Sequence, residues 1–318
     1  MNSFVLGGFP RSSRARKALR ALEEGSAHPS DVERIALEEN IALAWLQVGA
    51  GLSMVSDPVI EWHDMFRPFV EAWRGCFAGG LLRFFDNNFF YRVPIFVEMP
   101  SPAKLVLKPR VLALLERLPK WVKLKVVVPG PVTFAKMSRA PPGASFEEFA
   151  EALAKLLSEE VKAATEAGAK AVEVDEPWLV DVDASVDDAS LAVELFNKYF
   201  AKLGIETVLA TYFAPPSPEV WRALCEAKAS YLAIDVADSP KRAVEALRKA
   251  LPEGLALGIV QARDLVDPPL ERLAEVLDLA KDCKRLAVTT SSWLDLLPFD
   301  SAIDKVRKLA SIARELSR

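Results

Sequence analysis

The chain has 318 residues, with 40 basic and 44 acidic side chains and a formal net charge of −4 at pH 7. Hydrophobic residues make up 51% and charged residues 26%, which is typical of a globular protein with a substantial core. Because no basic block or long uncharged apolar run stands out, we expect neither a nucleic-acid-binding surface, nor an anionic-membrane surface, nor a transmembrane helix.

The cysteines indicate a reducing compartment. Cys76, Cys225 and Cys283 lie far apart, form no CxxC pair and are odd in number. The first ten residues lack the charged region that opens a secretory signal peptide. The sequence therefore predicts a cytoplasmic protein.

Short β-branched runs alternate with longer amphipathic segments, as expected for βα units around a parallel sheet. The predicted strand cores are Phe4–Leu6, Leu52–Val55, Leu124–Val128, Ala171–Val174, Thr207–Ala210, Leu232–Ile234, Leu257–Val260 and Leu286–Val288. About eight strands in roughly 320 residues fit an α/β fold with one (β/α)₈ TIM barrel over residues 1–318.

A long segment, residues 57–122, separates the second and third predicted strands. Helical patterns appear at Ile60–Arg74 and Pro109–Arg117, with an aromatic-rich stretch, Phe84–Tyr91, between them. No Gly/Ser linker flanks the segment. We therefore predict an insertion between strands 2 and 3 that lies over the barrel top.

Later helices follow the same periodicity. The helix predicted at 146–167 has an acidic start after Ser145 and a stop at Gly168. Further helices are predicted at Pro240–Leu251, Leu270–Lys281 and Ser301–Leu316.

Functional groups of such barrels gather at the carboxyl ends of the strands. Asp175 and Glu176 are adjacent carboxylates at one such end, and alternation directs one into the barrel and the other away. The inward carboxylate could anchor an amine or act as a general acid or base. The alternative is a helix-capping or salt-bridging carboxylate.

A basic cluster follows the first strand: Arg11, Arg14, Arg16, Lys17 and Arg20. Basic groups near a helix N-terminus oppose the helix dipole, so helix stability does not explain them. They form either a solvated face or a site for an anionic ligand, which Arg83 could join. The nearby aromatic residues suit a planar ligand or a lid packed on itself.

Metal and nucleophile signals are weak. His28 and His63 lie outside the strand ends and lack partners at metal-ligand spacing, so we expect no metal site. Cys225 and Cys283 fall in predicted helices, and no Ser or Cys lies in a recognisable nucleophile elbow.

Taken together and in order, the short sequence motifs at the strand ends resemble those of cobalamin-independent methionine synthase over nearly the whole chain. They are Gly8-Phe9-Pro10-Arg11, the insertion Phe85 to Tyr91, Gly130-Pro131-Val132-Thr133-Phe134, Asp175-Glu176-Pro177, Thr211-Tyr212-Phe213, Leu257 to Asp264 and Leu297-Pro298. The resemblance is to the N-terminal one of that family's two related barrels.

The catalytic barrel of that family carries a His-x-Cys, a Glu and a Cys that bind zinc. The matching positions here are Thr211 and Phe213, then Asp235, then the region 290–292. The resemblance thus implies that this chain binds no cofactor, and that zinc belongs to a separate catalytic barrel acting as its partner.

The resemblance also assigns substrate-binding residues. The N-terminal barrel contacts the polyglutamate tail of a methyl-folate donor, and by position this role falls on Arg16, Lys17 and Arg83. Asp175 and Glu176 match the Asp-Glu-Pro whose carboxylate holds the homocysteine amine in the catalytic barrel. No catalytic residue is assigned.

Three hypotheses follow. The first is the N-terminal-type subunit of a split methionine synthase, which transfers a methyl group from a methyl-folate or pterin donor to homocysteine. The second is a stand-alone, zinc-free methyltransferase or decarboxylase acting on a pterin, corrinoid or tetrapyrrole. The third is a non-catalytic binding barrel, since barrels host many functions.

Overall fold

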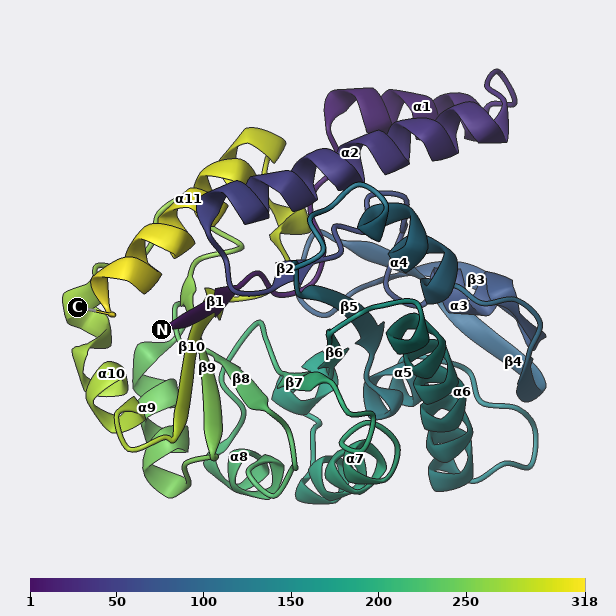
Figure 1. The fold of residues 1–318 in the computed structure, drawn as a ribbon. Helices are drawn as coiled ribbons and strands as arrows, with labels where there is room; N and C mark the ends of the chain where they lie inside the picture. Colours follow the sequence, from purple (N-terminus) through teal and green to yellow (C-terminus); the bar gives the residue numbers. More distant parts are fainter. Residues whose placement is uncertain (318) are drawn as a thin grey trace.

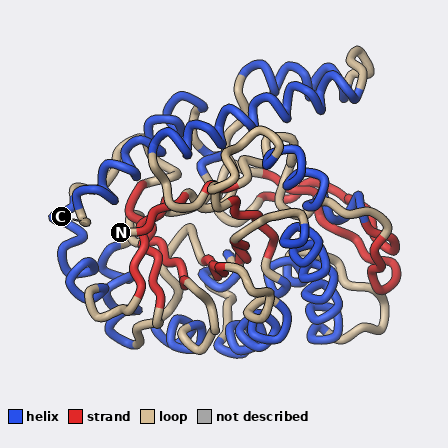
Figure 2. The backbone as a smooth tube through the Cα atoms, viewed as in Figure 1, coloured by secondary structure: helices blue, strands red, loops and turns tan. Residues whose placement is uncertain are grey.

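The computed structural model describes residues 1–317, and its centre is a sheet of eight parallel strands (Figure 2). The strands are β1 (Asn2–Phe4), β2 (Val55–Ser56), β5 (Leu124–Pro129), β6 (Ala171–Asp175), β7 (Glu206–Ala210), β8 (Tyr231–Asp235), β9 (Gly254–Val260) and β10 (Arg285–Thr290). Their spatial order is β1-β10-β9-β8-β7-β6-β5-β2. The gap between β1 and β2 is bridged by Ser53, whose amide and hydroxyl donate to the Ser3 carbonyl at 2.9 and 2.8 Å.

The predicted (β/α)₈ TIM barrel is confirmed, and each predicted strand lies within a few residues of the observed one. Helices surround the strands (Figure 1). They are α1 (Ser13–Glu23), α2 (Pro29–Ala50), α3 (Arg67–Ala72), α4 (Leu107–Leu115), α5 (Pro131–Lys136), α6 (Phe146–Glu166), α7 (Val186–Tyr199), α8 (Pro218–Leu224), α9 (Pro240–Lys249), α10 (Ala274–Ala280) and α11 (Phe299–Glu315), with 3₁₀ turns at Pro177–Val180, Leu270–Leu273 and Leu294–Leu296.

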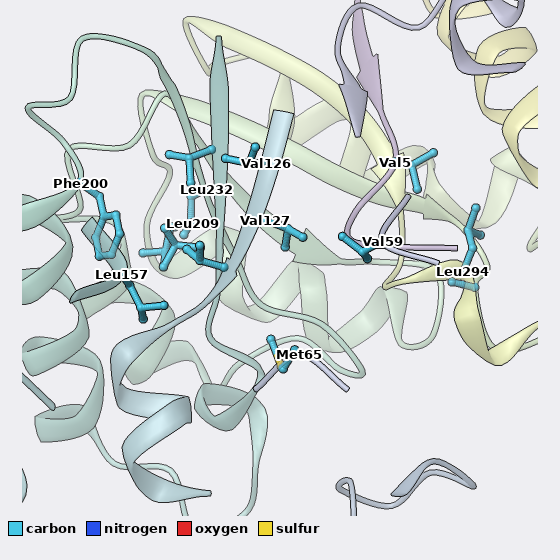
Figure 3. Close-up of a cluster of buried hydrophobic side chains, with 14 of the residues drawn as sticks. Val5, Val59, Met65, Val126, Val127, Leu157, Phe200, Leu209, Leu232 and Leu294 are labelled. Atoms are coloured by element: carbon cyan, nitrogen blue, oxygen red, sulfur yellow. The ribbon is translucent and has the colours of Figure 1, made fainter. Parts of the chain in front are cut away.

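No helix among residues 1–317 is long and apolar enough to cross a membrane. The helices instead bury one apolar side against the sheet. Helix α6 shows this, because Leu153 and Leu157 are fully buried while the Ser145 hydroxyl and the Glu148 carboxylate form a capping box at its start. Figure 3 shows Leu157 among the buried side chains that fill the space between the helices and the sheet.

The insertion between β2 and β5 forms an antiparallel hairpin of β3 (Trp73–Arg83) and β4 (Phe90–Pro102). It projects from the side of the barrel in Figure 1. The helix predicted at Ile60–Arg74 was wrong in extent, since only Arg67–Ala72 is helical. Residues 60–66 form turns and bends, and the Asp64 carboxylate accepts the amides of Phe66 and Arg67 where the helix begins. Three glycines, at 75, 79 and 80, weaken any helix beyond Trp73, and Gly75 adopts a positive φ of 85°.

The barrel interior contains a buried ion pair. Lys125 on β5 and Glu173 on β6 are both fully buried and bonded to each other. The Lys125 ammonium also donates to the Val5 carbonyl at 2.8 Å, and the Glu173 carboxylate accepts the Gly7 amide at 2.6 Å. The pair therefore connects β5 and β6 to the chain that leaves β1.

We predict that Lys125→Met destabilises the fold by about 3–5 kcal/mol, because it leaves the Glu173 carboxyl buried without its cation. Lys123→Met is the matched control, since the Lys123–Glu206 pair is more than one-third exposed on both sides and should contribute at most about 1 kcal/mol. Urea unfolding measures both. A double variant, Lys125→Met with Glu173→Gln, should recover part of the loss; equal effects at positions 123 and 125 would contradict this account.

Candidate functional site

A pocket with a cavity volume of about 200 Å³ lies at the carboxyl-terminal mouth of the barrel. Loops after four barrel strands and the tip of the β3–β4 hairpin form it. Its lining residues are Pro10, Arg11 and Arg16 after β1; Trp62, His63, Asp64 and Met65 after β2; Phe84 and Phe89 at the hairpin tip; Tyr212 and Phe213 after β7; and Trp293, Asp295, Leu296 and Leu297 after β10. The wall is mainly aromatic, with two arginines and two carboxyl groups among its polar members.

The floor of the pocket covers the fully buried carboxyl group of Asp175. Its Oδ2 accepts a hydrogen bond from Trp293 Nε1 at 2.7 Å and one from the Tyr212 hydroxyl at 3.3 Å. Its Oδ1 has no hydrogen-bond partner among the described residues. Burial, and then the nearby negative charge of Glu173, raise the pKa of Asp175 well above its usual value. Asp175 therefore retains a proton to higher pH than an exposed aspartate.

Trp293 can take this position because the chain after β1 is glycine. Gly7 adopts a positive φ of 56°, and a Cβ at this position would overlap the Trp293 indole. A Cβ on Gly8 would likewise press on Val59. Because Gly7 and Gly8 have no side chains, their backbone leaves a flat surface on which the indole lies.

Glu176 faces away from the barrel interior, as strand alternation predicts. Its carboxylate accepts the amides of Val132 at 3.0 Å and Thr133 at 2.7 Å, together with the Thr133 hydroxyl at 2.6 Å. These donors belong to the first turn of α5, where a negative charge is favourable. Burial nevertheless raises the pKa of Glu176 to about 7. The role that the structure shows for Glu176 is to fix α5 to β6.

The polar wall combines Arg11, Asp295 and His63. Arg11 donates to the carbonyl oxygens of Ile60 and Trp62 and so holds the loop after β2. Burial raises the pKa of Asp295 to about 7, against the opposing effect of Arg11. Burial, followed by the charges of Arg67 and Arg11, lowers the pKa of His63 to about 4, so this imidazole is neutral at pH 7.

Aromatic side chains from the hairpin tip and from the loop after β7 form the pocket roof. The ring centroids of Phe84 and Phe85 lie 6.0 and 5.7 Å from that of Phe213. Phe85 and Phe213 both have positive φ, at 52° and 81°. Such backbone costs roughly 1–3 kcal/mol at each residue and persists where the surroundings fix it.

The structure brings some of the predicted binding residues together and separates others. Arg16 is exposed and lines the pocket, whereas Lys17, its neighbour on α1, is exposed outside the pocket lining. Arg83 closes the hairpin turn by donating to the Asn87 carbonyl at 2.8 Å and the Asn88 side chain at 3.2 Å. Asp175 lies beneath the floor, and Glu176 lies on the other side of β6.

Sequence reasoning did not assign site roles to Tyr212, Trp293, Asp295 or Arg263. Tyr212 and Phe213 follow a predicted strand, so the sequence could place them at the mouth of the barrel. It could not reveal the hydrogen bond from the Tyr212 hydroxyl to Asp175. Trp293 contacts Gly7 and Asp175 across 286 and 118 residues of sequence, respectively. A short-range pattern cannot reveal such contacts.

The positions that the resemblance matches to zinc ligands do not fit a zinc ion. The Thr211 hydroxyl donates to the Ala233 carbonyl at 3.0 Å, and Phe213 has no ligand atom in its side chain. Ser291 exchanges hydrogen bonds with Ala262 and Gln261, which leaves Asp235 as the one strong zinc-ligand type in the set. Among residues 1–317, no group of three or more His, Cys, Asp or Glu side chains is placed to hold a metal ion.

Fold and site together define a (β/α)₈ barrel with an aromatic pocket at its mouth and cations on the rim, a geometry suited to a planar or partly apolar anionic ligand. Residues 70–284 match the family model described as the N-terminal domain of cobalamin-independent synthase. The chain belongs to this methionine synthase family, whose members are methyltransferases of methionine biosynthesis.

Two relatives named for methionine synthesis or homocysteine methylation are similar to this chain in sequence. The chain is 23% identical to a protein named methionine synthase from Thermococcus kodakarensis, over 99% of this chain and 94% of that one. It is 30% identical to 5-methyltetrahydropteroyltriglutamate–homocysteine methyltransferase of Mycolicibacterium paratuberculosis, over 74% of this chain and 33% of that protein. The chain thus spans about a third of the second relative's length.

Among solved structures, a B12-independent methionine synthase from Shewanella sp. W3-18-1, in complex with selenomethionine, has the same fold. The TM-score is 0.78 at 18% sequence identity, and the alignment covers 99% of this chain and 98% of that chain.

We predict that Gly7→Ala destabilises the protein more than Gly25→Ala. Both glycines have positive φ, which costs roughly 1–2 kcal/mol for an L residue. Nothing lies within 4 Å of a Cβ on Gly25, whereas the Cβ on Gly7 would displace Trp293 and add about 1–3 kcal/mol. Urea unfolding and tryptophan fluorescence measure the two effects. Equal losses with unchanged fluorescence would show that Trp293 does not depend on Gly7.

The raised pKa of Asp295 predicts a dependence of stability on pH. The folded state holds this proton up to a pKa of about 7, while the unfolded aspartate releases it near the ordinary aspartate pKa of 3.8. The contribution of Asp295 to stability is therefore lost as pH rises between these values. Asp295→Asn should become progressively more stable relative to the wild type over that range, unlike Asp300→Asn at an exposed position. A constant difference at every pH would refute the assignment.

Proposed function

We propose that this chain is the N-terminal-type subunit of a split methionine synthase. It works in the cytosol with a separate, zinc-bearing catalytic barrel, and together they transfer a methyl group from a methyl-folate or pterin donor to the sulfur of homocysteine. In this proposal the chain binds and orients the donor, and the partner barrel activates the sulfur.

The chemistry of the barrel mouth carries the proposal. The side chains at the positions of the family's zinc ligands carry hydroxyl groups, a phenyl group and a single carboxyl group, and Trp293 and Tyr212 form the pocket floor over Asp175. A hydroxyl or phenyl group cannot supply the thiolate or imidazole that zinc prefers. Activation of the homocysteine thiol therefore falls to another barrel.

The pocket supports the role in donor binding. Its aromatic wall, with Trp62, Phe89 and Trp293, offers flat surfaces for a pterin ring. The donor after which the Mycolicibacterium relative is named is a triglutamate. Arg16 on the pocket rim and Lys17 next to it are exposed cations that form no ion pair with other residues of 1–317, and they suit successive carboxylates of such a tail.

In this proposal the residues of this chain bind and orient the donor and take no part in the bond-making step. The aromatic side chains hold the ring and exclude water, and Arg16 directs the tail outward over α1. Asp175 fixes the indole of Trp293 and the phenol of Tyr212 as the floor on which the ring lies. These interactions lower the entropic cost of bringing the donor methyl group to the partner's thiolate.

One observation favours the second candidate, a stand-alone enzyme acting on a pterin, corrinoid or tetrapyrrole. Asp175 combines a raised pKa with a carboxyl oxygen that has no partner among the described residues, which are properties of a general acid. That function requires Trp293 to move, because the indole covers the carboxyl group. Turnover by the chain without any partner would favour this candidate.

The test uses a catalytic barrel supplied with zinc and measures methionine formation with this chain present. Arg16→Glu with Lys17→Glu should raise the KM for the triglutamate donor by about tenfold or more, since each charge-assisted contact contributes roughly 1.5–3 kcal/mol. The KM for the monoglutamate donor should change less than about twofold. Lys308→Glu, an exposed charge reversal on α11, is the control. Equal KM changes for both donors would refute the tail contact.

A further inference from the structure

Arg263, in the loop after β9, contacts three other loops of the barrel mouth. Its guanidinium donates to the Phe213 carbonyl at 3.0 Å, to the Asn87 side chain at 3.3 Å and to the Asp238 carboxylate at 2.9 Å. The same group lies over the Phe213 ring, 5.5 Å from its centroid. One side chain therefore joins the loops after β7 and β8 to the tip of the hairpin insertion.

Two of the three segments that Arg263 joins, the loop after β7 and the hairpin tip, form the pocket roof. Phe213 and Phe85 both have left-handed backbone, and their rings pack on each other. Left-handed phenylalanine is unfavourable on its own and needs fixing by its surroundings. Arg263 restrains the backbone of Phe213 through the hydrogen bond to its carbonyl. It restrains the hairpin tip through Asn87, which lies two residues from Phe85.

The roof is also linked to the floor. Tyr212 precedes Phe213, its ring lies 4.8 Å from the Phe213 ring, and its hydroxyl donates to Asp175. A shift of the loop at Phe213 therefore moves both the roof and one of the two donors to Asp175.

We propose that Arg263 is a positioning residue that clamps the hairpin tip, residues 84–89, onto the loop after β7 and thereby sets the affinity of the mouth pocket for its methyl donor. This inference rests on the proposed function for the identity of the donor. Arg263 itself does not line the pocket, so its effect passes through Phe84, Phe89 and Phe213.

The clamp requires the planar guanidinium group of arginine, with its several N–H donors. Three acceptors from three loops are served by separate N–H groups of one guanidinium, and its flat face covers the phenyl ring. Asp238 neutralises the charge and is itself held by Gln261. A lysine at this position could retain the ion pair with Asp238 but would lose the simultaneous contacts to the Phe213 and Asn87 loops.

The test compares Arg263→Gln with Arg242→Gln. Arg242, on α9, is the matched control because it also donates to a carbonyl in the loop after β7, that of Pro215 at 3.1 Å, and among the described residues it forms no hydrogen bond with the hairpin. Two readouts are measured on each folded variant. They are amide hydrogen exchange in residues 84–89 and the donor KM and kcat in the two-barrel methylation assay.

Arg263→Gln should speed exchange at the hairpin tip by about tenfold or more and raise the donor KM by a similar factor, with kcat within about twofold. Arg242→Gln should change neither. A merely destabilising role would lower the apparent kcat through loss of folded protein and leave KM unchanged. Arg263→Lys, which keeps the charge, should give the same rise in KM.

Unchanged exchange in Arg263→Gln would overturn the clamp, and faster exchange with an unchanged KM would overturn its role in donor affinity. Full rescue by lysine would contradict the requirement for the guanidinium group. If the wild-type chain supports no methylation with any zinc-bearing barrel, the proposed function fails separately. The exchange measurement then decides the clamp by itself.

Discussion

The structure of the mouth depends on the buried ion pair between Lys125 and Glu173 inside the barrel. Lys125 bonds Glu173 and the Val5 carbonyl, while Glu173 accepts the Gly7 amide. These contacts fix the chain after β1 against β5 and β6. One cation beside two buried carboxyl groups also cannot balance both charges, which is why the pKa of Asp175 is raised by Glu173 as well as by burial.

The position of Gly7 in turn determines what closes the barrel. With the chain fixed there and no Cβ in the way, the Trp293 indole lies on Gly7 and donates to Asp175. The strand ends that hold metal in the family's catalytic barrel thus lie around an aromatic floor in this chain. In the proposed function, the same barrel geometry binds a ligand through an aromatic surface where the catalytic barrel binds a metal, in agreement with the general rule that function depends on the site and not on the fold.

The sequence predicted the barrel strands well because each is a short apolar run bounded by turn residues, and α6 because its start and stop signals are local. It predicted too long a helix over Ile60–Arg74. The helix begins only at Arg67, because the Asp64 carboxylate accepts the amides of Phe66 and Arg67, and it ends at Ala72, because β3 pairs with β4 from Trp73 onward. The alternation of side chains along a strand correctly predicted that Asp175 and Glu176 point to opposite sides of β6. A charged residue at position 125, inside an otherwise apolar strand, was an available signal of the interior ion pair. The contacts of Trp293 and Arg263 join distant loops, so no local pattern could predict them.

The most direct test of the account is a titration of this chain into a fixed amount of zinc-bearing catalytic barrel, with methionine formation from homocysteine and the triglutamate donor as the readout. We expect no methionine from this chain alone and a rate that rises and saturates near one chain per catalytic barrel. Methionine formation by this chain without the catalytic barrel, or a catalytic-barrel rate that the chain leaves unchanged, would contradict it.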